Sequence, residues 1–95
     1  MALPKFLQPY LASYDLSTLD EEKDKELIIT EVLNKGDYEA LLWLLKTYSS
    51  RDIKKVLSFP TRGMWMKSVL WYWTKILDIK LPKKIYQKAI LNLNP

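Results

Sequence analysis

The residues of this chain with the clearest chemistry are its cations. Residues 51–95 contain ten Lys or Arg and two Asp, whereas residues 1–50 contain five Lys and nine Asp or Glu. The two halves therefore have net charges of +8 and −4, consistent with the total of +4. A cationic half raises the local potential and favours anionic partners such as nucleic acid, an acidic protein surface or a membrane surface. The sign of the partner's charge is thus predicted, although its identity is not.

Seven residues of the basic half form the site that we expect to bind the anionic partner. Lysines and arginines that neutralise phosphates release counterions, which makes binding sensitive to salt. An exposed tryptophan beside lysines could serve as an anchor in a protein interface or as a stacking platform for a base. The alternative is that the lysines only keep the chain soluble. The predicted binding residues are Arg51, Lys54, Lys55, Arg62, Lys67, Trp71 and Lys75.

A run of acidic residues offers oxygen atoms of the kind that Mg²⁺ and Ca²⁺ bind. Consecutive residues of a helix point in different directions, however, and Lys23 and Lys25 can compensate the negative charge. We therefore expect a solvated helix start, in which the carboxylates meet the positive end of the helix dipole. The run consists of Asp20, Glu21, Glu22, Asp24 and Glu26.

The chain has no cysteine and no histidine. Without these residues there is no thiolate nucleophile, no disulfide, no zinc site of the usual kind and no imidazole base. We expect a binding protein with no cofactor and no catalytic residues. A carboxylate-based metal enzyme is the third hypothesis, behind two binding hypotheses given below.

Apolar residues recur at intervals of three and four, which predicts an all-α fold. The chain length suits one compact domain over residues 1–95 with about five helices. A short turn or helix is expected in residues 3–14, followed by a long helix that begins at Thr18 or Asp20 and ends near Asn34 before Gly36. Residues 38–48, capped by Asp37, are apolar nearly all round and should form the central helix.

Three more helices are expected in the basic half. A short helix begins at Ser49 or Ser50, with Ile53, Val56 and Leu57 on its inward side, and the last helix begins near Pro82. Between them, a helix should run from residues 61–63 to about residue 78. Its inward side is predicted to contain Trp65, Met66, Val69, Leu70, Tyr72, Trp73, Ile76 and Leu77. Its outward side should contain Lys67, Ser68, Trp71, Thr74, Lys75 and Asp78.

Two pairs of these helices could form a helix-turn-helix. The pair joined by residues 58–63 would present Arg62, Lys67 and Trp71 to DNA. A helix-turn-helix has a turn of three or four residues, and this connection is longer and contains Pro60. The other pair, joined at Ser49-Ser50, has a short turn but offers fewer cations.

The sequence also predicts where the protein is located. Its longest apolar stretches, Ala40–Leu45 and Val69–Trp73, are much shorter than the roughly 20 residues of a membrane-spanning helix. The first five residues lack the pattern of a secretory signal. We expect a cytoplasmic protein that does not insert into a membrane.

A set of apolar positions and one Gly-Asp pair resembles a small uncharacterised prokaryotic helical domain. Members of that group are often encoded beside nucleotidyltransferase-like toxins of the abortive-infection type. The resemblance covers about residues 3–80 and implies the fold more directly than the activity. It implies an antitoxin-like role, with a toxin, DNA near its own gene, or both as partners. The matching residues are Ile28, Ile29, Val32, Leu33, Gly36, Asp37, Ala40, Trp43, Leu44, Tyr48, Ile53, Val56, Leu57, Trp73, Leu77 and Ile79.

Two functional hypotheses follow. In the first, the chain is a regulatory or antitoxin-like module that docks DNA or an acidic protein through its basic half. In the second, it is a protein-interaction or oligomerisation module, in which Trp43 and Trp71 bury against another chain or a second copy. The sequence leaves open whether these two tryptophans are exposed or covered.

Overall fold

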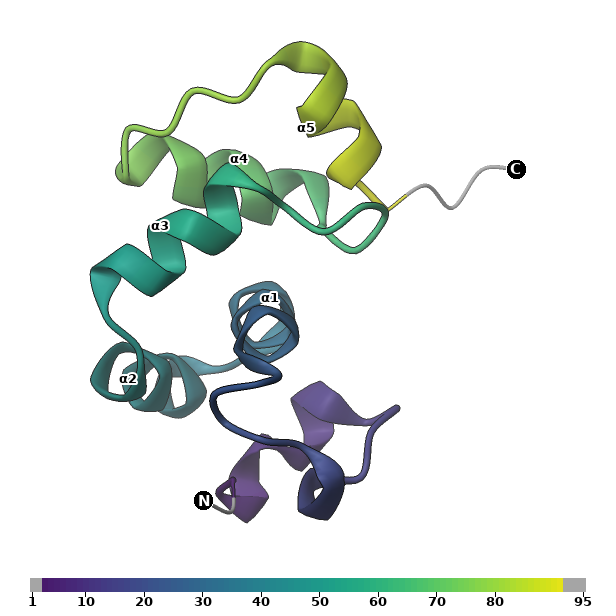
Figure 1. Cartoon of the computed structure of the whole chain (residues 1–95), viewed down its shortest axis with the longest axis vertical. Coiled ribbons are helices and arrows are strands. Elements are labelled where there is room, and N and C mark those ends of the chain that lie inside the picture. Colours follow the sequence, from purple (N-terminus) through teal and green to yellow (C-terminus); the bar gives the residue numbers. More distant parts are fainter. Residues whose placement is uncertain (1–2, 92–95) are drawn as a thin grey trace. The chain divides into compact units, whose positions relative to one another are not determined.

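The computed structural model describes residues 3–91, and helices make up most of them (Figure 1). No β-strand is present in this range, apart from an isolated bridge between Trp65 and Ile90. The all-α prediction is therefore confirmed. By its internal contacts the chain divides into an N-terminal unit, Met1–Ser49, and a C-terminal unit, Ser50–Pro95. The single domain over residues 1–95 stays a prediction.

The N-terminal unit is built from two 3-10 helices and two α-helices. The predicted N-terminal turn or helix is a 3-10 helix that contains Pro9 and buries Leu7 and Leu11. The helix expected from residue 18 or 20 begins later, at Lys25. In chain order the elements are η1 (Lys5–Leu11), η2 (Leu16–Thr18), α1 (Lys25–Lys35) and α2 (Tyr38–Thr47).

The central helix of this unit is α1, not the helix that follows it. Ile28, Ile29 and Val32 are almost fully buried, and α1 packs against both η1 and α2. By contrast, α2 buries only Ala40 and Leu44 among its own residues. Tyr38 is 75% exposed, so the prediction that residues 38–48 form the central helix was wrong. An all-round apolar helix needs neighbours on several sides, and within this unit α2 packs mainly on α1.

The boundary between α1 and α2 depends on Gly36 and Asp37. The Asp37 carboxylate accepts a hydrogen bond of 2.9 Å from the Ala40 N–H, so it caps α2 as predicted. Helix α1 also ends before Gly36 as predicted, but Gly36 has φ −67° and is not left-handed. A Cβ at Gly36 would lie 2.6 Å from the Val32 carbonyl oxygen. Glycine is therefore required here for space rather than for a left-handed backbone.

The C-terminal unit contains three α-helices. The loop that follows the first of these helices is held by a backbone hydrogen bond to the last one. The Trp65 N–H donates this bond to the Ala89 carbonyl at 2.9 Å. Trp65 is fully buried in an extended segment. The second helix therefore begins at Lys67 rather than at residues 61–63, because extended residues cannot continue a helix. The elements are α3 (Ser50–Ser58), α4 (Lys67–Ile76) and α5 (Lys83–Ala89).

The buried side of α4 differs from the predicted one. Leu70 is buried as expected, but Thr74, which was assigned to the outward side, is only 8% exposed. Its hydroxyl donates to the Leu70 carbonyl at 2.7 Å, which satisfies the polar atom within the helix. Tyr72 and Ile76, predicted to face inward, are 52% and 54% exposed. Within the C-terminal unit α4 packs chiefly on α3, which is too little to cover a wide apolar side.

Candidate anion-binding surface

All seven residues predicted to bind an anionic partner are exposed. All of them lie in the C-terminal unit. The structure distributes them over three elements rather than along a single helix: three lie on α3, one lies in the loop before α4, and three lie on α4. In that order they are Arg51, Lys54 and Lys55, then Arg62, then Lys67, Trp71 and Lys75.

The α3 group results from a strongly amphipathic helix. Ile53, Val56 and Leu57 are buried, which confirms the predicted inward face. The cations on the other side line a shallow hollow together with two serines and the exposed ring of Phe59. The lining residues are Ser50, Arg51, Lys54, Lys55, Ser58 and Phe59.

The α4 group forms one stripe. Lys67, Trp71 and Lys75 are spaced four residues apart, so they lie on the same side of the helix. Trp71 is 54% exposed, which answers the question that the sequence left open for this residue. The Lys75 Nζ lies 4.4 Å from the centroid of the Trp71 ring, a cation–π contact. An exposed aromatic ring with a lysine above it suits contact with a base or with a partner protein.

Arg62 belongs to a second hollow, which it shares with Lys84 and Lys88 of α5. These two lysines were not among the predicted binding residues. They lie more than twenty positions after Arg62 in the sequence, and on their own they are typical of the solvated side of a last helix. The signal that could have identified them is their spacing of four, which places both on one side of α5.

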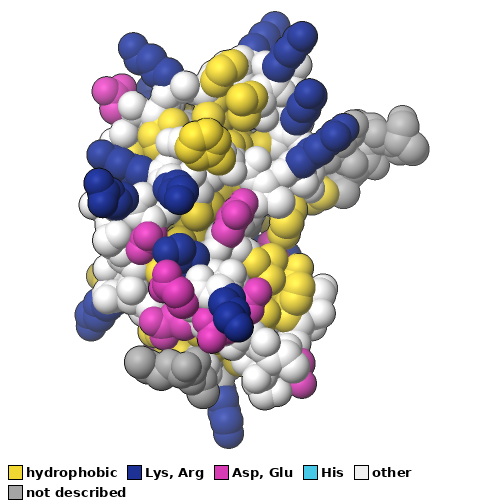
Figure 2. Space-filling model, viewed as in Figure 1, with side chains coloured by type: hydrophobic (Ala, Val, Ile, Leu, Met, Phe, Trp, Pro, Cys, Tyr) yellow, Lys and Arg dark blue, Asp and Glu magenta, His cyan; other side chains and the backbone are white. Residues whose placement is uncertain are grey.

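The cations of the C-terminal unit outnumber its two acids, Asp52 and Asp78. Within residues 3–91, no ion pair joins any of its ten Lys and Arg side chains to a carboxylate. The ion pairs that the structure shows, Lys25–Glu22 and Lys35–Glu31, lie in the N-terminal unit. Over the region of α3, α4 and α5, Figure 2 shows hydrophobic side chains ringed by Lys and Arg. This surface is therefore both cationic and partly apolar.

The connection between α3 and α4 does not form a helix-turn-helix. It spans residues 59–66, which is longer than the three or four residues of that motif. It also contains Pro60 and the segment paired with Ile90. The helix-turn-helix prediction was wrong for this pair of helices. The alternative pair, joined at Ser49-Ser50, stays a prediction.

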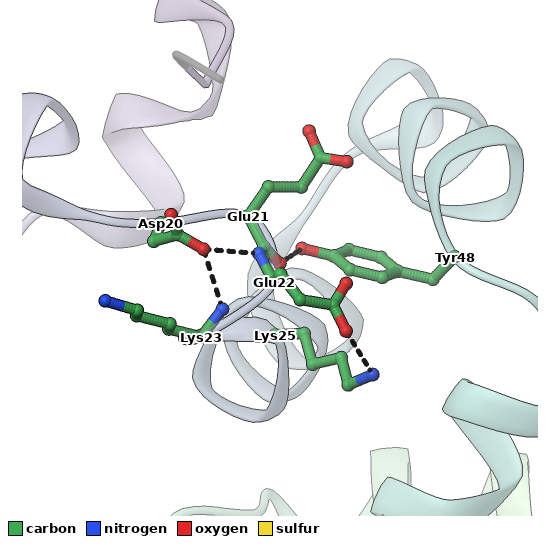
Figure 3. Close-up of polar contacts among 6 residues, drawn as sticks. All are labelled: Asp20, Glu21, Glu22, Lys23, Lys25 and Tyr48. Atoms are coloured by element: carbon green, nitrogen blue, oxygen red, sulfur yellow. Dashed lines mark hydrogen bonds and ion pairs between the residues drawn. The ribbon is translucent and has the colours of Figure 1, made fainter.

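The acidic run lies mostly before α1, which begins at Lys25, and only Glu26 lies in the first turn, so the helix starts later than the run predicted. The Asp20 carboxylate accepts hydrogen bonds from the Glu22 and Lys23 backbone N–H groups, both at 2.8 Å (Figure 3). These bonds favour the charged form and lower the pKa of Asp20. Within the described residues, no group of three or more His, Cys, Asp or Glu is arranged to hold a metal ion.

Trp43, the other tryptophan of uncertain exposure, packs inside the N-terminal unit. It is half-buried, and its ring meets the Tyr48 ring edge-on with centroids 5.9 Å apart. The Tyr48 hydroxyl in turn donates to the Glu21 carbonyl at 2.7 Å (Figure 3). Trp43 is therefore a weaker candidate for a docking anchor than Trp71.

Comparison with known proteins places the chain in a family without assigning an activity. A model for a family of unknown function (DUF6922) matches residues 8–57, more than half of the chain. The chain belongs to this family. No curated protein and no solved structure matches it. The matched region covers most of the N-terminal unit and nearly all of α3, including Arg51, Lys54 and Lys55, but it ends before Arg62 and α4.

None of the helices in residues 3–91 combines the length and the apolar character needed to cross a bilayer.

Proposed function

We propose that this protein is a non-catalytic, cytoplasmic binding module, antitoxin-like or regulatory in role, whose C-terminal unit docks an anionic macromolecule. The observation that supports this proposal is the exposure and pairing of the ten Lys and Arg side chains in the C-terminal unit. All ten are exposed, and none is paired with a described carboxylate. Like charges on one small unit repel one another, and a polyanion would relieve that repulsion.

Nucleic acid is the partner that this arrangement favours. Its phosphates repeat along the chain, so cations on α3, on α4 and in the loop between them could each contact a different phosphate. The exposed Trp71 ring would add stacking on a base. Since the connection between α3 and α4 does not match a helix-turn-helix, we expect contacts with the backbone rather than recognition of a base sequence.

Charge reversal tests the proposal. The double substitution Lys54→Glu and Lys67→Glu should weaken binding to a random duplex by at least about tenfold at low salt, because it removes two phosphate contacts and adds repulsion. Both side chains are exposed, so the fold should be retained. The binding constant is measured by fluorescence anisotropy with a labelled duplex.

The matched control carries the same charge change in the other unit. Lys5 and Lys23 are exposed residues of the N-terminal unit, and Lys5→Glu with Lys23→Glu should bind the duplex almost as the parent does. Equal losses of duplex affinity in both double variants would mean that only the net charge of the chain affects binding. That result, or no binding by the parent at low salt, would refute the nucleic-acid proposal.

A second candidate function is a protein interface on α4. Trp71, Tyr72 and Ile76 are each more than half exposed, although they are large apolar side chains. The partner would be an acidic protein, such as a toxin encoded nearby, or a second copy of the chain. Trp71→Ala should then abolish partner capture or self-association and leave the thermal transition nearly unchanged, because an exposed substitution costs little stability. A large loss of stability would contradict this candidate.

A further inference from the structure

The hollow beside α5 has an unusual lining. It measures about 620 Å³, and among the described residues its lining contains three cations and no carboxylate. Lys84 and Lys88 lie one turn apart on the same side of α5, and Gln87 lies between them. Arg62 reaches the hollow from the loop before α4. The hollow thus combines point charges, a planar guanidinium and an amide N–H donor.

The loop that contains Arg62 is held against α5 by backbone hydrogen bonds. The Gly63 N–H donates to the Lys88 carbonyl at 2.9 Å, and the Trp65 N–H donates to the Ala89 carbonyl at the same distance. Gly63 has φ +73°, a conformation that favours glycine, with open space around it. The backbone directly after Arg62 is therefore held near the two lysines before any ligand arrives, which lowers part of the entropy cost of binding.

The stability of α5 explains Lys88, which lies in the last turn where a cation is favourable, but it does not explain the lysines of the first turn. Lys83 and Lys84 occupy the first turn of the helix, where the dipole is positive, and no acid is present there. Lys84 and Lys88 are like charges at a spacing of four, which destabilises a helix. The carbonyls of Lys88 and Ala89, which would repel an anion, already accept hydrogen bonds from the loop. An anion in the hollow would offset this repulsion.

We infer that this hollow is a phosphate-binding site, in which Arg62, Lys84 and Lys88 hold one phosphodiester group of a nucleic-acid backbone. The inference rests on the proposed function and adds a defined site to it. The guanidinium can donate two parallel hydrogen bonds to a phosphate, and the two ammonium groups add charge from the side of α5. The site contains two residues, Lys84 and Lys88, that lie outside the predicted set.

The test is a titration of the full ¹⁵N-labelled chain, followed by NMR, with inorganic phosphate in one arm and a short single-stranded oligonucleotide in the other. Both ligands should shift the backbone signals of Gly63 and Lys88 and the side-chain amide of Gln87 along saturable curves. The triple variant Arg62→Gln, Lys84→Gln, Lys88→Gln should bind phosphate at least about tenfold more weakly, because each lost charge-assisted hydrogen bond reduces affinity.

The matched control removes the same charge from the N-terminal unit, with Lys5→Gln, Lys23→Gln and Lys46→Gln. This control should bind inorganic phosphate within about twofold of the parent, since none of these three exposed lysines lines the hollow. The single variant Lys88→Gln provides a milder second measurement, which should weaken phosphate binding without disturbing the fold.

The two arms separate the possible failures. The proposed phosphate site would be overturned if the NMR signals shift with phosphate without saturating. It would also be overturned if they shift equally in the triple variant of the hollow and in the control variant. An oligonucleotide that binds without shifting Gly63 or Lys88 would also overturn it, while leaving the proposed function standing. Saturable phosphate binding in the hollow with no oligonucleotide binding would support a site for free phosphate and overturn both the nucleic-acid ligand and the proposed function.

Discussion

At the scale of single residues, aspartates accept hydrogen bonds at the starts of η2 and α2 and in the turn before α1. Asp15 bonds to Ser17 at the start of η2, Asp20 caps the turn before α1, and Asp37 caps α2. The hydrogen bonds that these carboxylates accept lower the pKa of each one. For Asp37, the backbone N–H of Ala40 contributes most, and the Tyr10 hydroxyl adds a second bond.

These lowered pKa values predict a loss of stability in acid. A carboxyl group with a lower pKa in the folded state stabilises the fold fully above its unfolded pKa, near about pH 4, and loses that contribution as the pH falls through the folded pKa. The urea midpoint should therefore fall as the pH drops below about 4. In Asp37→Asn the amide can still cap α2 but cannot titrate, so this variant should have a shallower acid slope.

The control for this prediction is Glu39→Gln, which removes a charge from the same first turn of α2. This variant leaves in place the hydrogen bond from Ala40, which contributes most to lowering the pKa of Asp37. It should retain most of the parent's acid slope. An acid slope in Asp37→Asn as steep as the parent's would show that the cap bond does not couple stability to pH.

Gly36 gives a second prediction at this scale. A Cβ would lie 2.6 Å from the Val32 carbonyl and 3.0 Å from the Val32 Cγ1, so the helix end would have to shift. We expect Gly36→Ala to lower the free energy of unfolding by about 1–3 kcal/mol, as overpacking does. Ser13→Ala, an exposed change in the same unit, should have little effect in the same denaturation series. Unchanged stability in Gly36→Ala would contradict the close approach.

At the scale of elements, α4 is positioned by contacts at its first residues. Its start is fixed after the extended pair of Trp65 with Ile90, and the Tyr86 hydroxyl of α5 donates to the Lys67 carbonyl at 3.1 Å. Its buried side is centred on Leu70 and Thr74. The exposed side therefore presents Trp71, Tyr72 and Ile76 together with Lys75.

This orientation of α4 predicts unequal effects of truncating its apolar residues. Leu70→Ala should destabilise the chain by about 2–5 kcal/mol, because it leaves a cavity at a fully buried position. Ile76→Ala, at a residue that is 54% exposed, should cost only about 0.5 kcal/mol. The two free energies of unfolding can be compared by urea denaturation. A cost for Ile76→Ala as large as that for Leu70→Ala would restore the side predicted from the sequence.

The sequence predicted what depends on local chemistry. The helical period, the Asp37 cap, the helix end before Gly36 and the buried Ile53, Val56 and Leu57 all follow from residues near in the chain. It missed what depends on distant contacts. The pairing of Trp65 with Ile90 delayed the start of α4, and the same pairing brought Arg62 beside two lysines of α5.

At the scale of the whole molecule, the division of charge coincides with the division into units. The boundary at Ser49 and Ser50 leaves the N-terminal unit with −4 and the C-terminal unit with +8. The N-terminal unit uses its charges internally, in caps and in ion pairs such as Lys35–Glu31. The C-terminal unit leaves its cations exposed and unpaired with described acids, which is the basis of the proposed function.

The most direct test of that claim is the affinity of the unmodified chain for a random DNA duplex, measured across a salt series from about 20 to about 200 mM. The logarithm of the binding constant should fall linearly with the logarithm of the salt concentration, with a slope of about −0.9 for each phosphate contacted. Several cations acting together should give a slope steeper than about −2. No measurable binding at the lowest salt, or an affinity that does not change with salt, would contradict a polyanion-docking role for the C-terminal unit.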